Sequence, residues 1–395
     1  MMSGLLWVAL LAVGLAPSSD DNELTAKSEH ARSVEAARQE VYALRWRRSL
    51  VRTGIHRNVG TNFGGPVIVA SENLVVAGTG DGNIWGLDLG DGSKRWRYNH
   101  GSALGSTASL VSTRGEGFDP DLVVLGTLDG VLVAVDVATG RPVWRAALDG
   151  NSRAPVRQYG DRLYTLTSTN KVFAIDAASG RVAWSKGRPA SASLTIDGQA
   201  SPLVAGDLCI TTFSDGYVEA YKAADGAMVW SRPLSMGFHK FVDADADPVV
   251  SGGLLLVASY SDGIYALNLN DGQTVWQRPA PAVVSLTVAG DVLVVGSADG
   301  WVWGLANRDG HLLYRTRLPG GHLSRFWADE NWVIFSAGEA GLVVLETQTG
   351  KPLQSYDLGA TFSGDVAVTR DHVAVTTNSG QLVVLKRRSD LQPPS

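Results

Sequence analysis

The sequence predicts an all-β fold, and more specifically an eight-bladed β-propeller made of four-stranded blades. Glycine supplies 45 of the 395 residues, an excess over the usual share of about 7% that indicates many tight turns. An 11-residue segment that ends in tryptophan recurs along the chain. Asp-Gly and similar turns separate short runs of alternating residues, which is the pattern of β-hairpins.

The recurring segment sets the number of blades. It has five clear copies that end in Trp: GLDLGDGSKRW (86–96), AVDVATGRPVW (134–144), AIDAASGRVAW (174–184), AYKAADGAMVW (220–230) and ALNLNDGQTVW (266–276). Two degenerate copies follow at 304–314 and 344–354, in which Tyr314 and Gln354 take the tryptophan position. From Trp46 onward the segment ends are 50, 48, 40, 46, 46, 38 and 40 residues apart. This is the period of a four-stranded propeller blade.

The two ends of the chain are predicted to share the last blade. Residues 371–386 supply a hairpin with no tryptophan strand after it, whereas YALRW at 42–46 supplies a tryptophan strand with no hairpin before it. Joining them in one sheet closes the ring and removes an exposed seam. We therefore expect the propeller to span residues 44–388, followed by a short tail at 389–395.

The N-terminus is predicted to be an export signal. Residues 4–16 form an apolar run of 13 residues, too short for a membrane-spanning helix and suited to a signal peptide, which we place at 1–18. Residues 19–43 are polar, rich in alanine and free of glycine and proline, so we expect a helical arm. No cysteine lies near the processing site, so no covalent lipid anchor is evident. The formal charge of −5 argues against a nucleic-acid partner.

Residue types that carry catalysis are scarce. Cys209 is the single cysteine and lies in an apolar run, so we expect a buried, inert thiol and no disulfide. The seven histidines form no metal-ligand motif, and we expect neither a metal nor a cofactor. The run from Asp243 through Asp245 to Asp247 lacks the spacing of a calcium loop. It is either a solvated acidic loop or a binding site for a basic or polar surface.

The 11-residue segments resemble the tryptophan-docking motif of the quinoprotein, or PQQ-like, β-propeller superfamily over residues 42–388. A large indole late in each blade can pack on the next blade, and the small residue at the start of each segment leaves room for it. The quinoprotein dehydrogenases of this superfamily hold their cofactor partly with two adjacent cysteines. This chain cannot supply that pair, and we expect a protein that is not an enzyme.

Two further segments resemble the BamB family of outer-membrane assembly factors. In that family a Leu-x-Leu-Arg-Gly segment precedes one strand and an Asp-x-Asp segment precedes the equivalent strand one blade later, and both contact BamA. LTIDGQASPLV (194–204) places Leu194 and Ile196 on the apolar positions, and FVDADADPVV (241–250) places Asp243 and Asp245 on the acids. Asp197 takes the position of the arginine, which reverses the charge. Asp247 is a third acid, expected to make this patch more negative.

The resemblance implies a periplasmic scaffold, peripherally associated with the outer membrane. It would bind a POTRA domain of a BamA-like insertase, with other subunits of the assembly complex as further partners, and assist the insertion of outer-membrane β-barrels. The alternative is a generic secreted propeller that binds another envelope protein, a peptide or a polysaccharide. That alternative gains if Leu194 and Ile196 only begin a buried strand. A quinoprotein dehydrogenase is the least favoured interpretation.

Overall fold

A computed structural model describes residues 32–33, 40–51, 64–115, 117–189, 199–234, 246–319, 322–338, 340–357 and 364–388. The chain divides into two compact units, residues 1–31 and 32–395. The first unit lies outside the described residues, as do the predicted signal peptide (1–18) and C-terminal tail (389–395). The fold below is that of the second unit.

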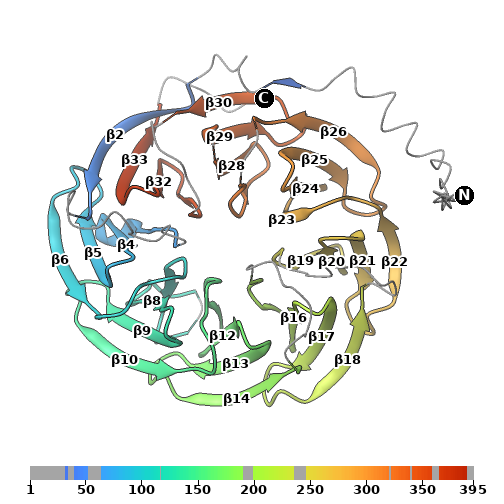
Figure 1. The fold of residues 1–395 in the computed structure, drawn as a ribbon, viewed down its shortest axis with the longest axis horizontal. Coiled ribbons are helices and arrows are strands. Elements are labelled where there is room, and N and C mark those ends of the chain that lie inside the picture. The colour runs from blue at the N-terminus through green and yellow to red at the C-terminus, as the bar shows by residue number, and fades with distance from the viewer. Residues whose placement is uncertain are drawn as a thin grey trace, which may run out of the picture. The chain divides into compact units, whose positions relative to one another are not determined.

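The second unit is an eight-bladed β-propeller, which confirms the predicted fold class. Eight antiparallel sheets follow one another around a ring, and the fourth strand of each lies at the circumference (Figure 1). The described residues include one short 3-10 helix, η3 (Ala70–Glu72). No helix in the described part of the chain is long and apolar enough to cross a membrane.

The first four blades follow the chain from its innermost to its outermost strand. Their strands are β3 (Val67–Val69), β4 (Leu74–Gly78), β5 (Asn83–Asp88) and β6 (Lys94–Asn99); β7 (Ser109–Val111), β8 (Leu122–Gly126), β9 (Val131–Asp136) and β10 (Pro142–Ala147); β11 (Arg157–Tyr159), β12 (Arg162–Thr167), β13 (Lys171–Asp176) and β14 (Val182–Gly187); and β15 (Leu203–Ala205), β16 (Leu208–Thr212), β17 (Tyr217–Lys222) and β18 (Met228–Pro233).

The next three blades repeat this order, and the eighth takes its outer strand from the N-terminal side of the chain. Their strands are β19 (Val249–Ser251), β20 (Leu254–Ser259), β21 (Gly263–Asn268) and β22 (Thr274–Arg278); β23 (Val283–Ala289), β24 (Val292–Ser297), β25 (Trp301–Ala306) and β26 (Leu312–Arg317); β27 (Trp327–Ala328), β28 (Trp332–Ala337), β29 (Gly341–Glu346) and β30 (Pro352–Tyr356); and β31 (Ala367–Val368), β32 (His372–Thr376), β33 (Gln381–Arg387) and β2 (Tyr42–Ser49).

The hydrophobic core consists of layers between neighbouring blades. Val76 and Ile84 of one blade, for example, pack with Val123 and Val133 of the next. The two middle strands of a blade are buried on both faces because each sheet lies between two others. This explains why runs such as VLVAVD read as almost continuously apolar rather than alternating.

The repeated tryptophans join one blade to the next, as predicted. The indole Nε1 of Trp144 donates a hydrogen bond of 3.0 Å to the carbonyl of Ala177 in the following blade. Gly180 of that blade packs on the indole and has φ of +70°, so a Cβ there would be strained and would lie 2.5 Å from the ring. Equivalent bonds are made by Trp46 to Leu89, Trp96 to Val137, Trp184 to Ala223 and Trp230 to Leu269.

The ring closes beside a joint at which Gln354 replaces the repeated tryptophan. The side-chain amide of Gln354 donates to the carbonyl of Tyr42 (2.6 Å), and its oxygen accepts from the backbone N–H of Tyr42 (2.8 Å). β2 then pairs with β33, from Tyr42 opposite Arg387 to Ser49 opposite Gln381. The predicted sharing of the last blade by both chain ends is therefore confirmed.

Within the predicted helical arm (19–43), residues 32–33 and 42–43 lie in strands instead. β1 (Arg32–Ser33) pairs in parallel with β26, with Arg32 opposite Thr316, and β2 begins at Tyr42. Helix propensity is a local preference, and the unpaired backbone groups at a sheet edge override it here. Tyr42 itself is buried in the ring.

Candidate partner-binding site and central cavity

The five residues predicted to contact a partner lie outside the described residues. Leu194, Ile196 and Asp197 fall in 190–198, and Asp243 and Asp245 fall in 235–245. The structure does describe the residues that follow these two ranges, from Gln199 and from Ala246 onward. Both segments belong to connectors that lead from the outer strand of one blade to the innermost strand of the next.

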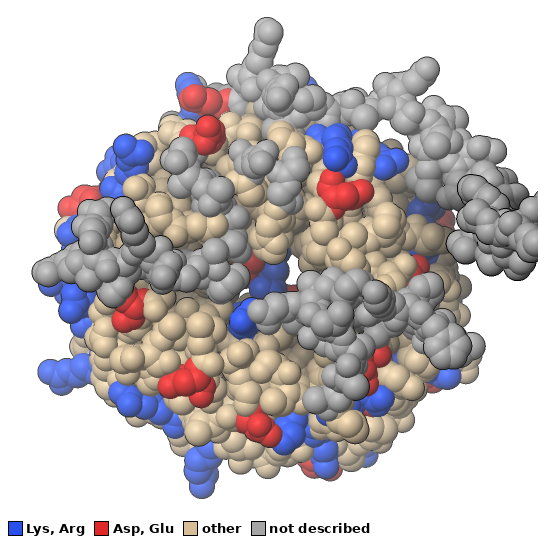
Figure 2. Space-filling view, viewed as in Figure 1, with Lys and Arg blue, Asp and Glu red and all other residues tan. Residues whose placement is uncertain are grey.

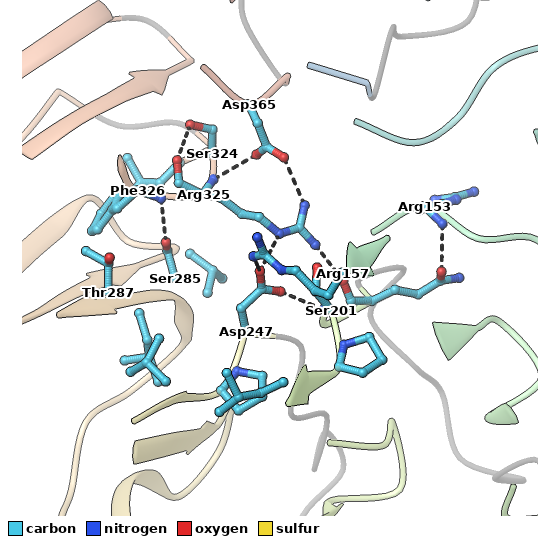
Figure 3. A pocket seen from close by; sticks show the side chains of 18 of the residues that line it. Arg153, Arg157, Ser201, Asp247, Ser285, Thr287, Ser324, Arg325, Phe326 and Asp365 are labelled. Carbon is cyan, nitrogen blue, oxygen red and sulfur yellow. Dashed lines mark hydrogen bonds and ion pairs between the residues drawn. The ribbon is translucent and has the colours of Figure 1, made fainter. Parts of the chain in front are cut away.

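These connectors end at a cavity of about 700 Å³ inside the ring. Figure 2 shows the hollow at the centre of the ring with basic and acidic side chains within it. Innermost strands supply apolar lining residues such as Leu203 and Val249 and the charged Arg157, and the connectors supply further charged ones such as Asp247 and Arg325. Figure 3 shows the charged side chains converging on one another.

Arg325 is the central member of this charged cluster. Its Nε lies 3.2 Å from Asp247 Oδ2, and its Nη1 lies 3.1 Å from Asp365 Oδ2 (Figure 3). Its Nη2 donates a hydrogen bond of 2.6 Å to the carbonyl of Gln199. All three guanidinium nitrogens thus have acceptors from three different blade connectors. The two carboxylates raise the pKa of Arg325 despite the opposing effect of burial.

Asp247 belongs to this cluster and not to an exposed acidic patch, which corrects the expectation from the sequence. Its side chain is 11% exposed. Oδ2 also lies 2.9 Å from Arg157 Nη2, and Oδ1 accepts a hydrogen bond of 2.7 Å from the backbone N–H of Ser201. Burial raises the pKa of Asp247, but Arg325 and Arg157 lower it more, so the net shift is downward. Asp247 is therefore a buried anion that ties connectors together.

The cluster extends a pattern that repeats around the inner rim. In several blades the residue two positions before the innermost strand bonds to a neighbouring connector. Thr107 accepts from the N–H of Gly65 (3.1 Å) and donates to Asp365 (2.6 Å), and Asp365 accepts from the N–H of Arg325 (3.0 Å). Sequence reasoning missed this inner set. Its signal was a polar residue at the same place in five of the eight repeats, namely Thr107, Ser201, Asp247, Arg325 and Asp365.

The described residues offer no other reactive centre. Cys209 is fully buried, as predicted, and burial raises the pKa of its thiol to about 12. Within the described ranges, no group of three or more His, Cys, Asp or Glu side chains could hold a metal ion. The cavity arginines Arg157 and Arg325 are already paired with carboxylates. This arrangement orders backbone segments rather than presenting a nucleophile or a general base.

The fold and the tryptophan repeat define the class, an eight-bladed propeller of PQQ-like repeats. The family model described as "Outer membrane protein assembly factor BamB" matches residues 14–137, 105–316 and 298–389. The chain belongs to this BamB family.

Solved structures agree on the fold. BamB from Moraxella catarrhalis is 21% identical, with a TM-score of 0.74 over 88% of this chain and 100% of that one. A quinohemoprotein alcohol dehydrogenase, ADHIIG from Pseudomonas putida HK5, is 11% identical, with a TM-score of 0.67 over 91% of this chain and 79% of that one.

One curated relative is an enzyme. The 1-butanol dehydrogenase (quinone) of Thauera butanivorans is 29% identical over 117 residues, which make up 29% of this chain but 17% of that protein.

Proposed function

We propose that this protein is a periplasmic scaffold of the BamB type. In this proposal it binds the POTRA region of a BamA-type insertase and assists assembly of outer-membrane β-barrels. Membership of the family supports the general role, and the predicted signal peptide supports the compartment. The observation that carries the proposed site is that Gln199 and Asp247, which follow the predicted contact residues in the two segments, are bonded to the same guanidinium.

In this proposal recognition depends on two segments that are carried by one ring. Leu194 and Ile196 would supply apolar contact area, while Asp243 and Asp245 would pair with basic or amide groups of the partner. Asp197 adds a third acid where the family has arginine. The proposed partner surface is accordingly more basic than one that faces an arginine. Binding energy, and not a chemical step, is the output of such a site.

A non-enzymatic role is also supported by the sequence of the chain. Cys209 is its single cysteine, so the adjacent cysteine pair of the quinoprotein dehydrogenases cannot form. A likeness of the fold to those enzymes does not bring their chemistry with it. Oxidation of an alcohol by the purified chain, measured with a redox dye and added quinone cofactor, would instead favour a quinoprotein dehydrogenase.

The test is direct binding between the mature chain and purified POTRA domains of a BamA-type protein from the same source, measured by calorimetry. The double variant Leu194→Glu with Asp245→Arg should bind at least about 100-fold more weakly, because it places charge on an apolar contact and reverses an acidic one. Val143→Glu with Asp161→Arg is the matched control, since both positions are exposed and lie in other elements. It should bind like the wild type.

The results distinguish an error in the proposed partner from an error in the proposed site. Wild-type binding that the first double variant retains would refute the site. Absence of wild-type binding to the POTRA domains would refute the partner, and would return the protein to the generic class of secreted propellers.

A further inference from the structure

We infer that Arg325 is a positioning residue that fixes Gln199 and Asp247, the described parts of the two connectors that carry the predicted contact residues. The inference rests on the proposed function for its consequence, partner binding. Its structural content stands on described residues alone. Arg325 belongs to neither segment, and lies 126 residues from Gln199 and 78 residues from Asp247 in the chain.

The side chain of Arg325 bonds to both connectors. Gln199 immediately follows residues 190–198, and its carbonyl accepts from Nη2 of Arg325 at 2.6 Å. Asp247 follows residues 235–245 with one residue between, and its Oδ2 lies 3.2 Å from Nε. A guanidinium is planar, so its nitrogens fix the directions of their acceptors as well as their distances. The two connectors cannot shift independently while both bonds are made.

Arg325 is itself immobilised from the opposite side. Asp365, which precedes the innermost strand of the closing blade, accepts from the backbone N–H of Arg325 and from its Nη1. Thr107 donates to the same carboxylate. The connectors are thus tied to blades on the far side of the cavity. Movement of the guanidinium would break bonds to three connectors at once.

Asp247 and Gln199 keep other hydrogen-bond partners when the guanidinium of Arg325 is removed. Asp247 keeps Arg157 and the N–H of Ser201 as partners. Gln199 keeps its side-chain bonds to Asn151 and to the N–H of Arg153. The two connectors therefore stay joined to each other through Ser201 and Asp247, and to the third blade through Arg157, while their link to the far side of the ring disappears. Loss of Arg325 should loosen the two connectors without opening the ring.

Two variants test the inference in the full chain. Arg325→Lys keeps the charge, but an ammonium on a flexible stem cannot align three nitrogens with three acceptors. Arg325→Gln with Asp365→Asn removes one cation and one anion together, which limits the risk of unfolding. Gln354→Ala is the matched control. Its side chain is also buried and makes two hydrogen bonds between distant segments, but at the outer closing joint.

The first readout is hydrogen–deuterium exchange of peptides that cover residues 199–205 and 246–251. Exchange of the Ser201 amide, which donates to Asp247, should be at least tenfold faster in both Arg325 variants and unchanged in Gln354→Ala. The second readout is affinity for the POTRA domains, normalised to folded protein. It should fall at least tenfold in the Arg325 variants and stay unchanged in the control.

Failure of the inference and failure of the proposed function are distinguishable. Unchanged exchange in the Arg325 variants would overturn the inference, whatever the partner. Faster exchange combined with wild-type affinity would overturn it as well, since the arrangement would then not matter for binding. Faster exchange in a protein whose wild type does not bind the POTRA domains would support the structural inference and refute the proposed partner.

Discussion

Replacing Trp144 by alanine tests whether the repeated indole holds the ring together. The side chain is 8% exposed, packs on Gly180 and donates to the carbonyl of Ala177 in the next blade. The substitution empties this space and removes the donor. A blade joint would then depend on the remaining aliphatic contacts of its layer.

The expected loss follows from the buried area and the lost bond. An indole that buries on the order of 200 Å², at about 25 cal/mol per Å², contributes roughly 5 kcal/mol. Alanine retains a small part of this, while the carbonyl of Ala177 loses its partner. Measured losses for such buried aromatic truncations are about 3–5 kcal/mol. We therefore expect the free energy of unfolding to fall by about 4 kcal/mol.

The assay is urea unfolding followed by circular dichroism. Val143→Ala is the control, because Val143 adjoins Trp144 but is 50% exposed, and it should change stability by no more than about 0.5 kcal/mol. Gly180→Ala should also destabilise, since its Cβ would meet the indole. In the Trp144→Ala background that collision is absent, so the two losses should fall short of additivity by at least about 1 kcal/mol. An unfolding midpoint of Trp144→Ala equal to that of the wild type would refute the docking role.

Two further predictions concern buried groups. Because burial raises the pKa of Cys209 to about 12, a thiol reagent at pH 8 should modify the native protein at least about 100-fold more slowly than the protein in guanidinium chloride; equal rates would contradict its burial. The pKa of Asp247 is lower in the folded protein than its value of about 3.9 in the unfolded chain. The charged carboxylate therefore stabilises the fold above that unfolded pKa. This stabilisation is lost as the pH falls through the lower pKa of the folded state. Asp247→Asn should therefore cost about 3 kcal/mol at pH 7 and flatten the decline in stability below about pH 4, measured by urea unfolding across pH; a decline as steep as that of the wild type would contradict this account.

The ring was predictable because its defining signal is local and repeated. Each Trp-bearing segment carries its own turn and its own small residue, so one blade can be recognised without knowledge of the others. Even the joint at Gln354 fell at the expected spacing. The prediction of a helix was wrong at residues 32–33. Arg32 pairs with the edge strand β26, and such a tertiary contact cannot be predicted from local helix propensity.

The inner rim was not predictable because its partners are chosen by ring closure. Asp247 was recognised as an acid in an acidic run, yet its partners Arg157 and Arg325 lie 90 and 78 residues away. Asp247 stands two residues before β19, where the chain reaches the cavity. Only the placement of blades around the ring brings those arginines within reach.

The outer rim, where the repeated tryptophans join the blades, and the inner rim, where the connectors meet at the cavity, therefore have different roles in one scaffold. At the outer rim five joints share the same indole bond and the Gln354 joint replaces it with two amide bonds, so stability is spread over several similar sites. At the inner rim the equivalent residue varies between connectors, for example Gly65, Thr107, Asp247 and Arg325, and its side chain decides which connectors are bonded together. A substitution at the outer rim should weaken the whole ring. One at the inner rim should leave the ring closed and change how its connectors are presented to a partner.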